Sequence, residues 1–153
     1  MYQLGYLSER LEFIPTIAQW HFQEWGHHGV GDSVERRVEW LTEAANRQQV
    51  PTVIIAYEGD KVLGTAMLVE SDMKIRRELT PWVASVYVAA EERGKGIGAA
   101  LVLRVTEEAK ALGYARIYLF AFDAEKYYAR MGWQLRERVE YLGVEVAVME
   151  RDL

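Results

Sequence analysis

The chain has 153 residues, of which half are hydrophobic and 27% are charged, as is typical of one globular domain, here residues 1–153. A net charge of −5, from 18 Lys and Arg against 23 Asp and Glu, argues against a general nucleic-acid binder and suits a cationic small-molecule or peptide amine. The absence of cysteine excludes disulfides, thiolate metal sites and a cysteine nucleophile.

The N-terminal stretch has neither a basic region nor the apolar run of a signal peptide. No window approaches the roughly 18 apolar residues that a membrane-spanning helix needs. We therefore expect a cytoplasmic protein that has no membrane partner.

The first third of the chain predicts a short strand, Tyr2–Leu7, followed by two helices. Pro15 suits the first turn of a helix, and apolar residues at helical spacing continue to about Trp25. Asp32–Glu35 resembles a capping box that opens the second helix. His27 and His28 lie between the two helices, but adjacent side chains diverge, so we expect no metal site.

The rest of the chain alternates strands and helices. Gly59 and Asp60 have the chemistry of a tight hairpin turn, and the polar segment Ser71–Thr80 is expected to be a mobile loop beside a site. The predicted strands are Thr52–Tyr57, Lys61–Glu70, Trp82–Val88, Ala115–Phe122, Trp133–Glu140 and Glu145–Glu150.

Two helices are predicted in this part. The longer one presents an apolar face of Leu101, Val102, Val105, Ala109 and Leu112 and ends at Gly113. The shorter one, Ala124–Met131, is expected to be capped by Asp123 and to end at Gly132.

The strand from Trp82 alternates in residue character. We expect one face to carry Trp82, Ala84, Val86 and Val88, and the other Val83, Ser85 and Tyr87.

A glycine-rich loop joins this strand to the longer helix. Its residues are Arg93, Gly94, Lys95, Gly96, Ile97, Gly98 and Ala99. Unpaired N–H groups and the helix dipole favour phosphate at such a position, and the two basic residues add positive charge.

Three classes of phosphate site compete for this loop. A Walker loop is excluded because no Gly-Lys-Ser/Thr follows the glycines. Gly94, Gly96 and Ala99 formally satisfy the dinucleotide fingerprint, with Asp123 about twenty residues on. That fold, however, requires repeated strand–helix–strand units, which the preceding eighty or so residues do not predict.

Two motifs carry a resemblance to a known family. Arg93-x-x-Gly96-x-Gly98 after an apolar strand resembles the acyl-CoA pyrophosphate loop of the GNAT superfamily of N-acetyltransferases. Tyr128-x-x-x-Gly132-Trp133 resembles the turn after the last helix of that superfamily, with Trp where Phe is common. The resemblance implies a mixed α/β fold, in which one mostly antiparallel central sheet is flanked by helices in the order β-α-α-β-β-β-α-β-α-β-β.

The resemblance also implies acetyl-CoA as the acetyl donor. The diphosphate would bind the loop from Arg93 to Ala99, and the pantetheine arm would run along the strand backbone at Val86, Tyr87 and Val88. The Asn often found seven residues before the helix Tyr is Ala121 here, so we expect another group, such as Asp123, to supply its hydrogen bond to the cofactor.

The residue assigned by resemblance to protonate the departing thiolate is Tyr128; its neighbour Tyr127 is the alternative. Glu70 is the expected general base because it ends a strand beside the mobile loop. Asp72, Glu78 or a water ordered by Ser85 remain alternatives.

The acceptor pocket is expected to include Glu24, Trp25, Trp82 and Ser85, since aromatic rings with a carboxylate suit a cationic amine. The sequence thus predicts direct acetyl transfer to a primary amine of a small molecule or peptide, with a homodimer possible and no nucleic-acid partner. The alternative is a non-catalytic acyl-CoA-binding module.

Overall fold

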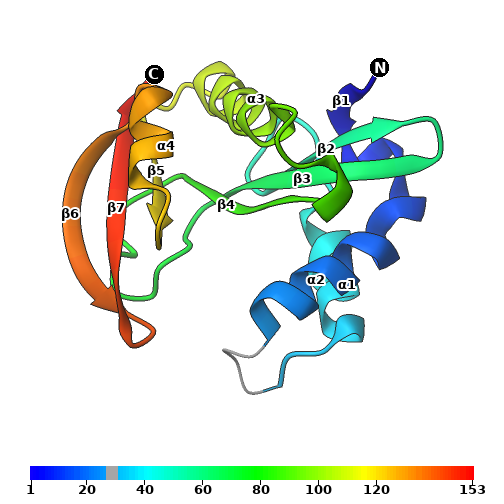
Figure 1. Ribbon diagram of the computed structural model, residues 1–153, viewed down its shortest axis with the longest axis horizontal. Coiled ribbons are helices and arrows are strands. Elements are labelled where there is room, and N and C mark those ends of the chain that lie inside the picture. Colours follow the sequence, from blue (N-terminus) through cyan, green and yellow to red (C-terminus); the bar gives the residue numbers. More distant parts are fainter. Residues whose placement is uncertain (27–30) are drawn as a thin grey trace.

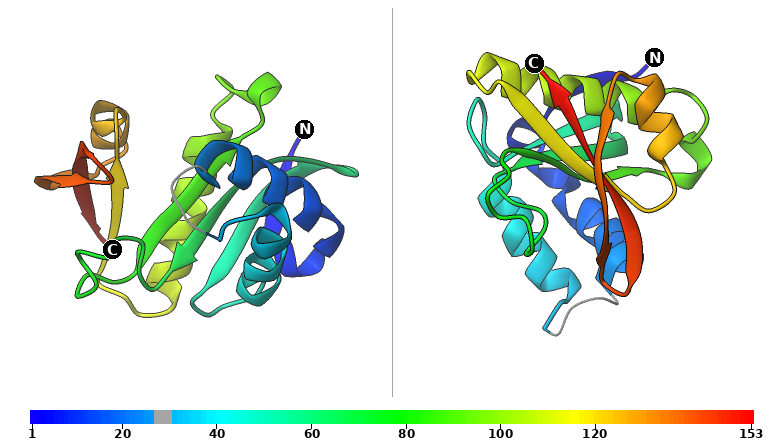
Figure 2. Two further views of the ribbon diagram at one scale, coloured as in Figure 1. Left: turned by 90° about the horizontal axis from the view of Figure 1, so that it is seen from below. Right: turned by 90° about the vertical axis from the view of Figure 1, so that its left-hand side faces the viewer.

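Seven strands form one sheet with helices on both faces in the residues that the structure describes, 1–26 and 31–153 (Figures 1 and 2). In this computed structural model the elements run β1 (Gln3–Tyr6), α1 (Ile14–Trp25), α2 (Val34–Ala44), β2 (Thr52–Glu58), β3 (Lys61–Val69), β4 (Trp82–Val88), α3 (Ile97–Ala111), β5 (Arg116–Ala121), α4 (Glu125–Arg130), β6 (Gln134–Tyr141) and β7 (Val144–Asp152), with 3-10 turns at Leu7–Glu9, Leu11–Phe13 and Ala90–Glu92. The order of elements predicted from the sequence is confirmed.

The sheet is mixed but mostly antiparallel. Its strand order is β1-β2-β3-β4-β5-β7-β6, and β4–β5 is its parallel pair among the strands that the structure describes. Both the predicted mixed α/β class and the predicted sheet type are therefore confirmed.

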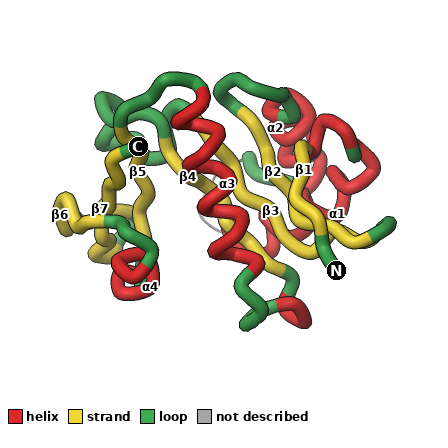
Figure 3. Tube along the Cα trace, turned by 90° about the horizontal axis from the view of Figure 1, so that it is seen from above, coloured by secondary structure: helices red, strands yellow, loops and turns green. Residues whose placement is uncertain are grey.

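Two helical layers enclose the sheet (Figure 3). On one face, α3 buries Leu101, Val102 and Val105 against β2, β3 and β5. On the other face, α1 and α2 pack against β2 through a separate cluster that includes Ile17, Leu41 and Val53. The predicted inward position of Leu112 is wrong, because this residue follows the end of α3 and is exposed.

The starts of the helices follow local chemistry. Pro15 lies in the first turn of α1, as predicted. In α2 the N-cap is Ser33, whose hydroxyl accepts a 3.0 Å hydrogen bond from the Arg36 N–H, while Asp32 binds the Arg37 guanidinium. The predicted cap by Asp123 is wrong: Ala124 occupies the N-cap position of α4 and no side chain caps that helix.

A bulge in β4 overturns the predicted division of its faces. Ser85 has φ +53°, and the pairing with β3 passes from Met67–Ala84 to Thr65–Tyr87, so β4 has one extra residue. An extra residue reverses the alternation beyond it. Val86 and Val88 consequently pack against the α3 cluster, whereas Trp82 lies in a different cluster.

The neighbouring strands β4 and β5 diverge after a single paired position. The two strands pair only at Trp82–Tyr118, while β5 continues in full register with β7 (Figure 1). The backbone groups of β4 that would face β5 are therefore left without a strand partner beyond this point.

Within the described residues, no helix is long and apolar enough to cross a membrane. The same residues contain no cluster of three or more side chains that could hold a metal ion. His27 and His28 lie outside the described residues.

Candidate active site

The loop before α3 exposes backbone donors. Gly94 and Gly96 have φ of +80° and +82°, a conformation that favours glycine. The Ala100 N–H donates to the Gly96 carbonyl over 3.1 Å, so the preceding N–H groups of the first turn are the donors that a helix leaves without an intrahelical partner. These donors and the helix dipole make this end of α3 suited to an anion.

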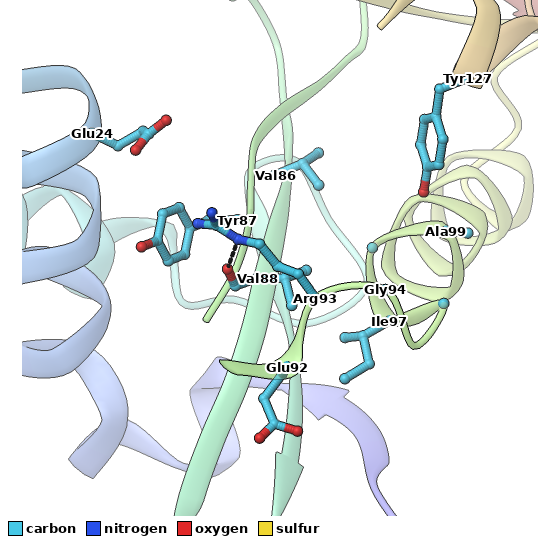
Figure 4. A pocket seen from close by; sticks show the side chains of 12 residues that line it. Glu24, Val86, Tyr87, Val88, Glu92, Arg93, Gly94, Ile97, Ala99 and Tyr127 are labelled. Carbon is cyan, nitrogen blue, oxygen red and sulfur yellow. Dashed lines mark hydrogen bonds between the residues drawn. The ribbon is translucent and has the colours of Figure 1, made fainter. Parts of the chain in front are cut away.

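A cavity of about 590 Å³ lies against this loop (Figure 4). Its walls include Val86, Tyr87, Val88, Arg93, Gly94, Gly96, Ile97, Gly98 and Ala99, together with Glu24 of α1 and Tyr127 of α4. Most of the residues expected to bind the cofactor are thus brought together here. Lys95 is the loop residue that does not line the cavity, and its ammonium lies 3.0 Å from the Glu92 carboxylate.

Arg93 lies folded against β4 (Figure 4). Its Nε donates a 2.9 Å hydrogen bond to the Val88 carbonyl, and its guanidinium carbon is 5.3 Å from the centre of the Tyr87 ring. Tyr87 in turn packs against Trp20 and Trp25 of α1, with ring centres 5.2 and 6.3 Å away. A chain of stacked side chains therefore joins the loop to the first helix.

A second cavity, of about 550 Å³, adjoins the first. Val86 lines both, so the two cavities meet on β4 just after the bulge. Besides Val86, four expected site residues line the second cavity, namely Trp25, Ser85, Asp123 and Tyr128. Asp72, one of the alternatives to Glu70 as the base, also lines it.

Burial shifts the acid–base properties of two groups in the second cavity. Burial, with a smaller contribution from Tyr127, raises the pKa of Tyr128 to about 12, so its hydroxyl keeps its proton over the whole physiological range. Burial alone raises the pKa of Asp72 from 3.8 to about 7. Asp72 therefore changes charge near neutral pH, where a proton acceptor is most useful.

Other expected site residues lie apart from this cavity. Glu70 is exposed and lines a neighbouring hollow with Asp72 and Tyr141, but it does not line the cavity that holds Tyr128. Trp82 is fully buried and lines neither main cavity, because its indole N–H donates to the Leu79 carbonyl within the core. Glu24, expected in the acceptor pocket, lines the first cavity and not the second.

Sequence reasoning missed three aromatic residues of the second cavity. Phe120, Phe122 and Tyr141 line it, as does Arg37, whose guanidinium forms a bidentate pair with Asp32. Phe120 and Phe122 are two residues apart, and this spacing places them on one side of a strand. That spacing was the available signal, but an apolar strand indicates a core just as well.

Tyr127 and Tyr128 divide between the two cavities. The Tyr127 hydroxyl would lie 3.6 Å from a Cβ at Gly98, above the start of α3, whereas the Tyr128 ring packs at 6.2 Å from that of Trp133. Each adjacent tyrosine therefore faces a different part of the site.

The model of the acetyltransferase (GNAT) family matches residues 14–133. The chain belongs to this family. Comparison with curated proteins finds no match. Among solved structures, an N-acetyltransferase from Staphylococcus aureus Mu50 is 20% identical, with a TM-score of 0.76 over 99% of this chain and 98% of its own.

Two further structures were solved with the cofactor. An aminoglycoside 6'-N-acetyltransferase complexed with coenzyme A is 14% identical, with a TM-score of 0.76 over 98% of this chain and 96% of its own. A putative acetyltransferase from Salmonella typhimurium with its cofactor acetyl-CoA is 18% identical, with a TM-score of 0.72 over 100% of this chain and 94% of its own. Together with the family match, they support acetyl-CoA as the donor expected from the sequence.

The raised pKa of Asp72 has a consequence for stability. Between pH 3.8 and about 7 the unfolded chain has lost this proton while the folded chain keeps it, so rising pH removes stability over that interval. Asp72→Asn removes this pH-dependent loss of stability, because the amide side chain does not ionise. In thermal unfolding without ligand, we expect the variant and wild type to have equal Tm near pH 4, and the variant to be more stable by at least about 3 °C at pH 8.

The matched control is Glu70→Gln, an exposed carboxylate two residues away, expected to shift Tm by less than about 2 °C at both pH values. An Asp72→Asn variant that is no more stable than wild type at pH 8 would contradict the assignment of Asp72 as a buried acid.

Proposed function

We propose that this protein is an N-acetyltransferase that moves the acetyl group of acetyl-CoA directly to a primary amine of a small molecule or peptide. The observation that carries this proposal is the meeting of two cavities at Val86. One is lined by the anion-binding loop, and the other contains a proton acceptor and a hydroxyl donor. In this proposal the thioester lies where the two cavities meet, so that the cofactor extends to it from the first cavity and the amine approaches it from the second.

The proposed cofactor position follows from the backbone. The diphosphate binds the N–H groups at the start of α3, and the pantetheine arm lies along Val86–Val88, where β4 has no β5 partner. In this proposal Arg93 gives up its hydrogen bond to the Val88 carbonyl and donates to a phosphate oxygen instead. The Val88 carbonyl can then accept a hydrogen bond from an amide of the pantetheine arm. Asp123, on the wall of the second cavity, remains the proposed substitute for the family's Asn.

The reaction needs a neutral amine. Neutralising an amine of pKa about 10.4 at pH 7 costs about 4–5 kcal/mol, at roughly 1.36 kcal/mol per unit. In the proposed step Asp72 accepts a proton from the ammonium group, and the neutral nitrogen attacks the thioester carbonyl carbon. The carbon–sulfur bond then breaks, and the second proton that the nitrogen loses as the amide forms passes to the departing thiolate. Asp72 is preferred to Glu70 because it lines the same cavity as Tyr128.

Tyr128 is proposed to stabilise the leaving thiolate. Because the pKa of Tyr128 is raised to about 12, a complete proton transfer to a thiolate of pKa about 8.5 is uphill. A hydrogen bond from its hydroxyl to the charged sulfur remains favourable and is stronger than one between neutral groups. No cysteine exists for a covalent enzyme intermediate, so direct transfer is the proposed route.

Two finer expectations belong to the same proposal. We place the enzyme in the cytoplasm, where acetyl-CoA is available. The homodimer stays a prediction to be examined by the mass of the protein in solution.

The loop is tested by a pair of glycine variants. Gly96→Ala adds a methyl group on the wall of the first cavity and is expected to weaken CoA binding at least about tenfold by calorimetry, because close approach to the backbone is lost. Gly113→Ala is the control: its φ of +93° matches, and its surroundings are equally open, but it lies at the far end of α3. Equal CoA affinity in both variants would contradict the proposed diphosphate site.

Catalysis is tested by thiol release from acetyl-CoA over a panel of primary amines. Tyr128→Phe is expected to lower kcat about 100-fold, within the usual range for a proton donor, with little change in CoA affinity. Tyr127→Phe is the control, expected to change KM for acetyl-CoA rather than kcat, because Tyr127 lines the cofactor cavity. Tight CoA binding with no release across the panel would instead favour the non-catalytic module.

The base is tested by two neighbouring carboxylates. Asp72→Asn is expected to lower kcat/KM about 100-fold at pH 8, while Glu70→Gln changes it less than about threefold. In the wild type, kcat/KM should rise with pH through about 7 as Asp72 loses its proton. A large loss in Glu70→Gln with none in Asp72→Asn would reverse the assignment.

A further inference from the structure

Several aromatic rings line the second cavity. Phe120 contacts two of these rings: its ring centre lies 5.8 Å from that of Phe122 and 5.5 Å from that of Tyr141, at interplanar angles of 77° and 83°. Trp82 packs behind Phe120 at 6.4 Å and fixes its position from the core. Trp25 of α1 lines the same cavity.

These rings form a surface that the fold itself leaves partly uncovered. Phe122 is 48% exposed although it sits directly after β5, and Phe120 and Tyr141 are only half-buried. These rings contact one another edge to face, and their uncovered parts can make the same kind of contact with a ring of a ligand. An apolar wall with a few convergent polar groups is the usual composition of a small-molecule site.

The charges of the cavity favour a single positive charge on the ligand. Asp72 is half-buried on the wall, while Asp123 is exposed. Arg37 is the cationic side chain among the described residues of the same wall. Its guanidinium forms an ion pair with the Asp32 carboxylate, with a nitrogen–oxygen distance of 2.7 Å. Asp72 and Asp123 are the carboxylates among the described residues of this wall, and a ligand with several ammonium groups would bring some of them towards Arg37.

We propose that the acceptor is a small monoamine whose amino group is joined by a short chain to an aromatic ring. Phe120, Phe122, Tyr141 and Trp25 contact the ring, and Asp72 binds the amine next to the thioester. This inference rests on the proposed acetyl transfer and narrows its substrate class.

The test compares amines in the thiol-release assay with the full-length protein. For 2-phenylethylamine we expect kcat/KM at least tenfold above the values for spermidine, for the aminoglycoside kanamycin and for a peptide that begins with alanine. Phe122→Ala should raise the KM for 2-phenylethylamine about tenfold and leave kcat nearly unchanged. For ethylamine, which lacks the ring, the same variant should change kcat/KM less than threefold.

Leu103→Ala is the matched control, because Leu103 is a similarly exposed apolar side chain, at 46%, on the outside of α3. It should leave the kinetics of both amines unchanged. Phe122 is itself exposed, so its loss should not threaten folding, which circular dichroism checks.

The outcomes separate the two proposals. Turnover of spermidine, kanamycin or the peptide above that of 2-phenylethylamine would overturn the aromatic acceptor and leave acetyl transfer standing. An equal loss for ethylamine and 2-phenylethylamine in Phe122→Ala would also overturn it, since the ring would then have no part. No thiol release with any amine would overturn both proposals.

Discussion

The divergence of β4 from β5 is the constraint on which the rest of the site depends. Parallel neighbours would normally continue their ladder and satisfy each other's backbone groups. Here the pairing stops after Trp82–Tyr118, although the Tyr118 N–H still bonds to the Pro81 carbonyl at 3.0 Å. At this point Trp82 packs against the rings of Tyr118 and Phe120. The residues of β4 that follow Trp82 line both cavities.

The bulge at Ser85 allows one strand to serve both cavities. Without the extra residue, Val86 would point to the same side as Trp82 and would no longer pack against the core cluster beneath α3. With it, Val86 and Val88 pack towards α3, while Tyr87 contacts Trp20 and Trp25. A non-glycine residue at positive φ costs of order 1–3 kcal/mol and persists only where the surroundings hold it, as is common at functional sites.

Much of the fold could be predicted because its signals are local. The helical spacing of α3, the glycines before it and the hairpin at Gly59 each act within a few residues. The glycine loop and Tyr128 were likewise visible as motifs. The faces of β4 were mispredicted because a bulge depends on its pairing with β3, which no spacing within β4 reveals. The predictions for Leu112 and for a cap by Asp123 were wrong because both residues lie at the end of a helix. There a shift of one residue in the helix boundary changes whether a side chain is buried or caps the helix.

The second cavity was less predictable because it is assembled from distant segments. Phe120 comes from β5, and Phe122 follows the end of that strand. Tyr141 comes from the end of β6, and Asp72 from the loop before β4. Nothing in the chain distinguishes Asp72 from Glu70 except its burial, which depends on how these segments pack.

That same burial gives the two polar groups their different roles. It raises the pKa of both Asp72 and Tyr128, and in each case it favours the protonated form. Their ordinary values differ by about six units, however, so equal directions lead to unlike results. Asp72 comes to titrate near neutral pH and can take up a proton, while Tyr128 moves further from titration and can only donate a hydrogen bond. In the proposed reaction one partly enclosed cavity therefore supplies both a proton acceptor for the amine and a permanent donor for the sulfur, without a second charged residue.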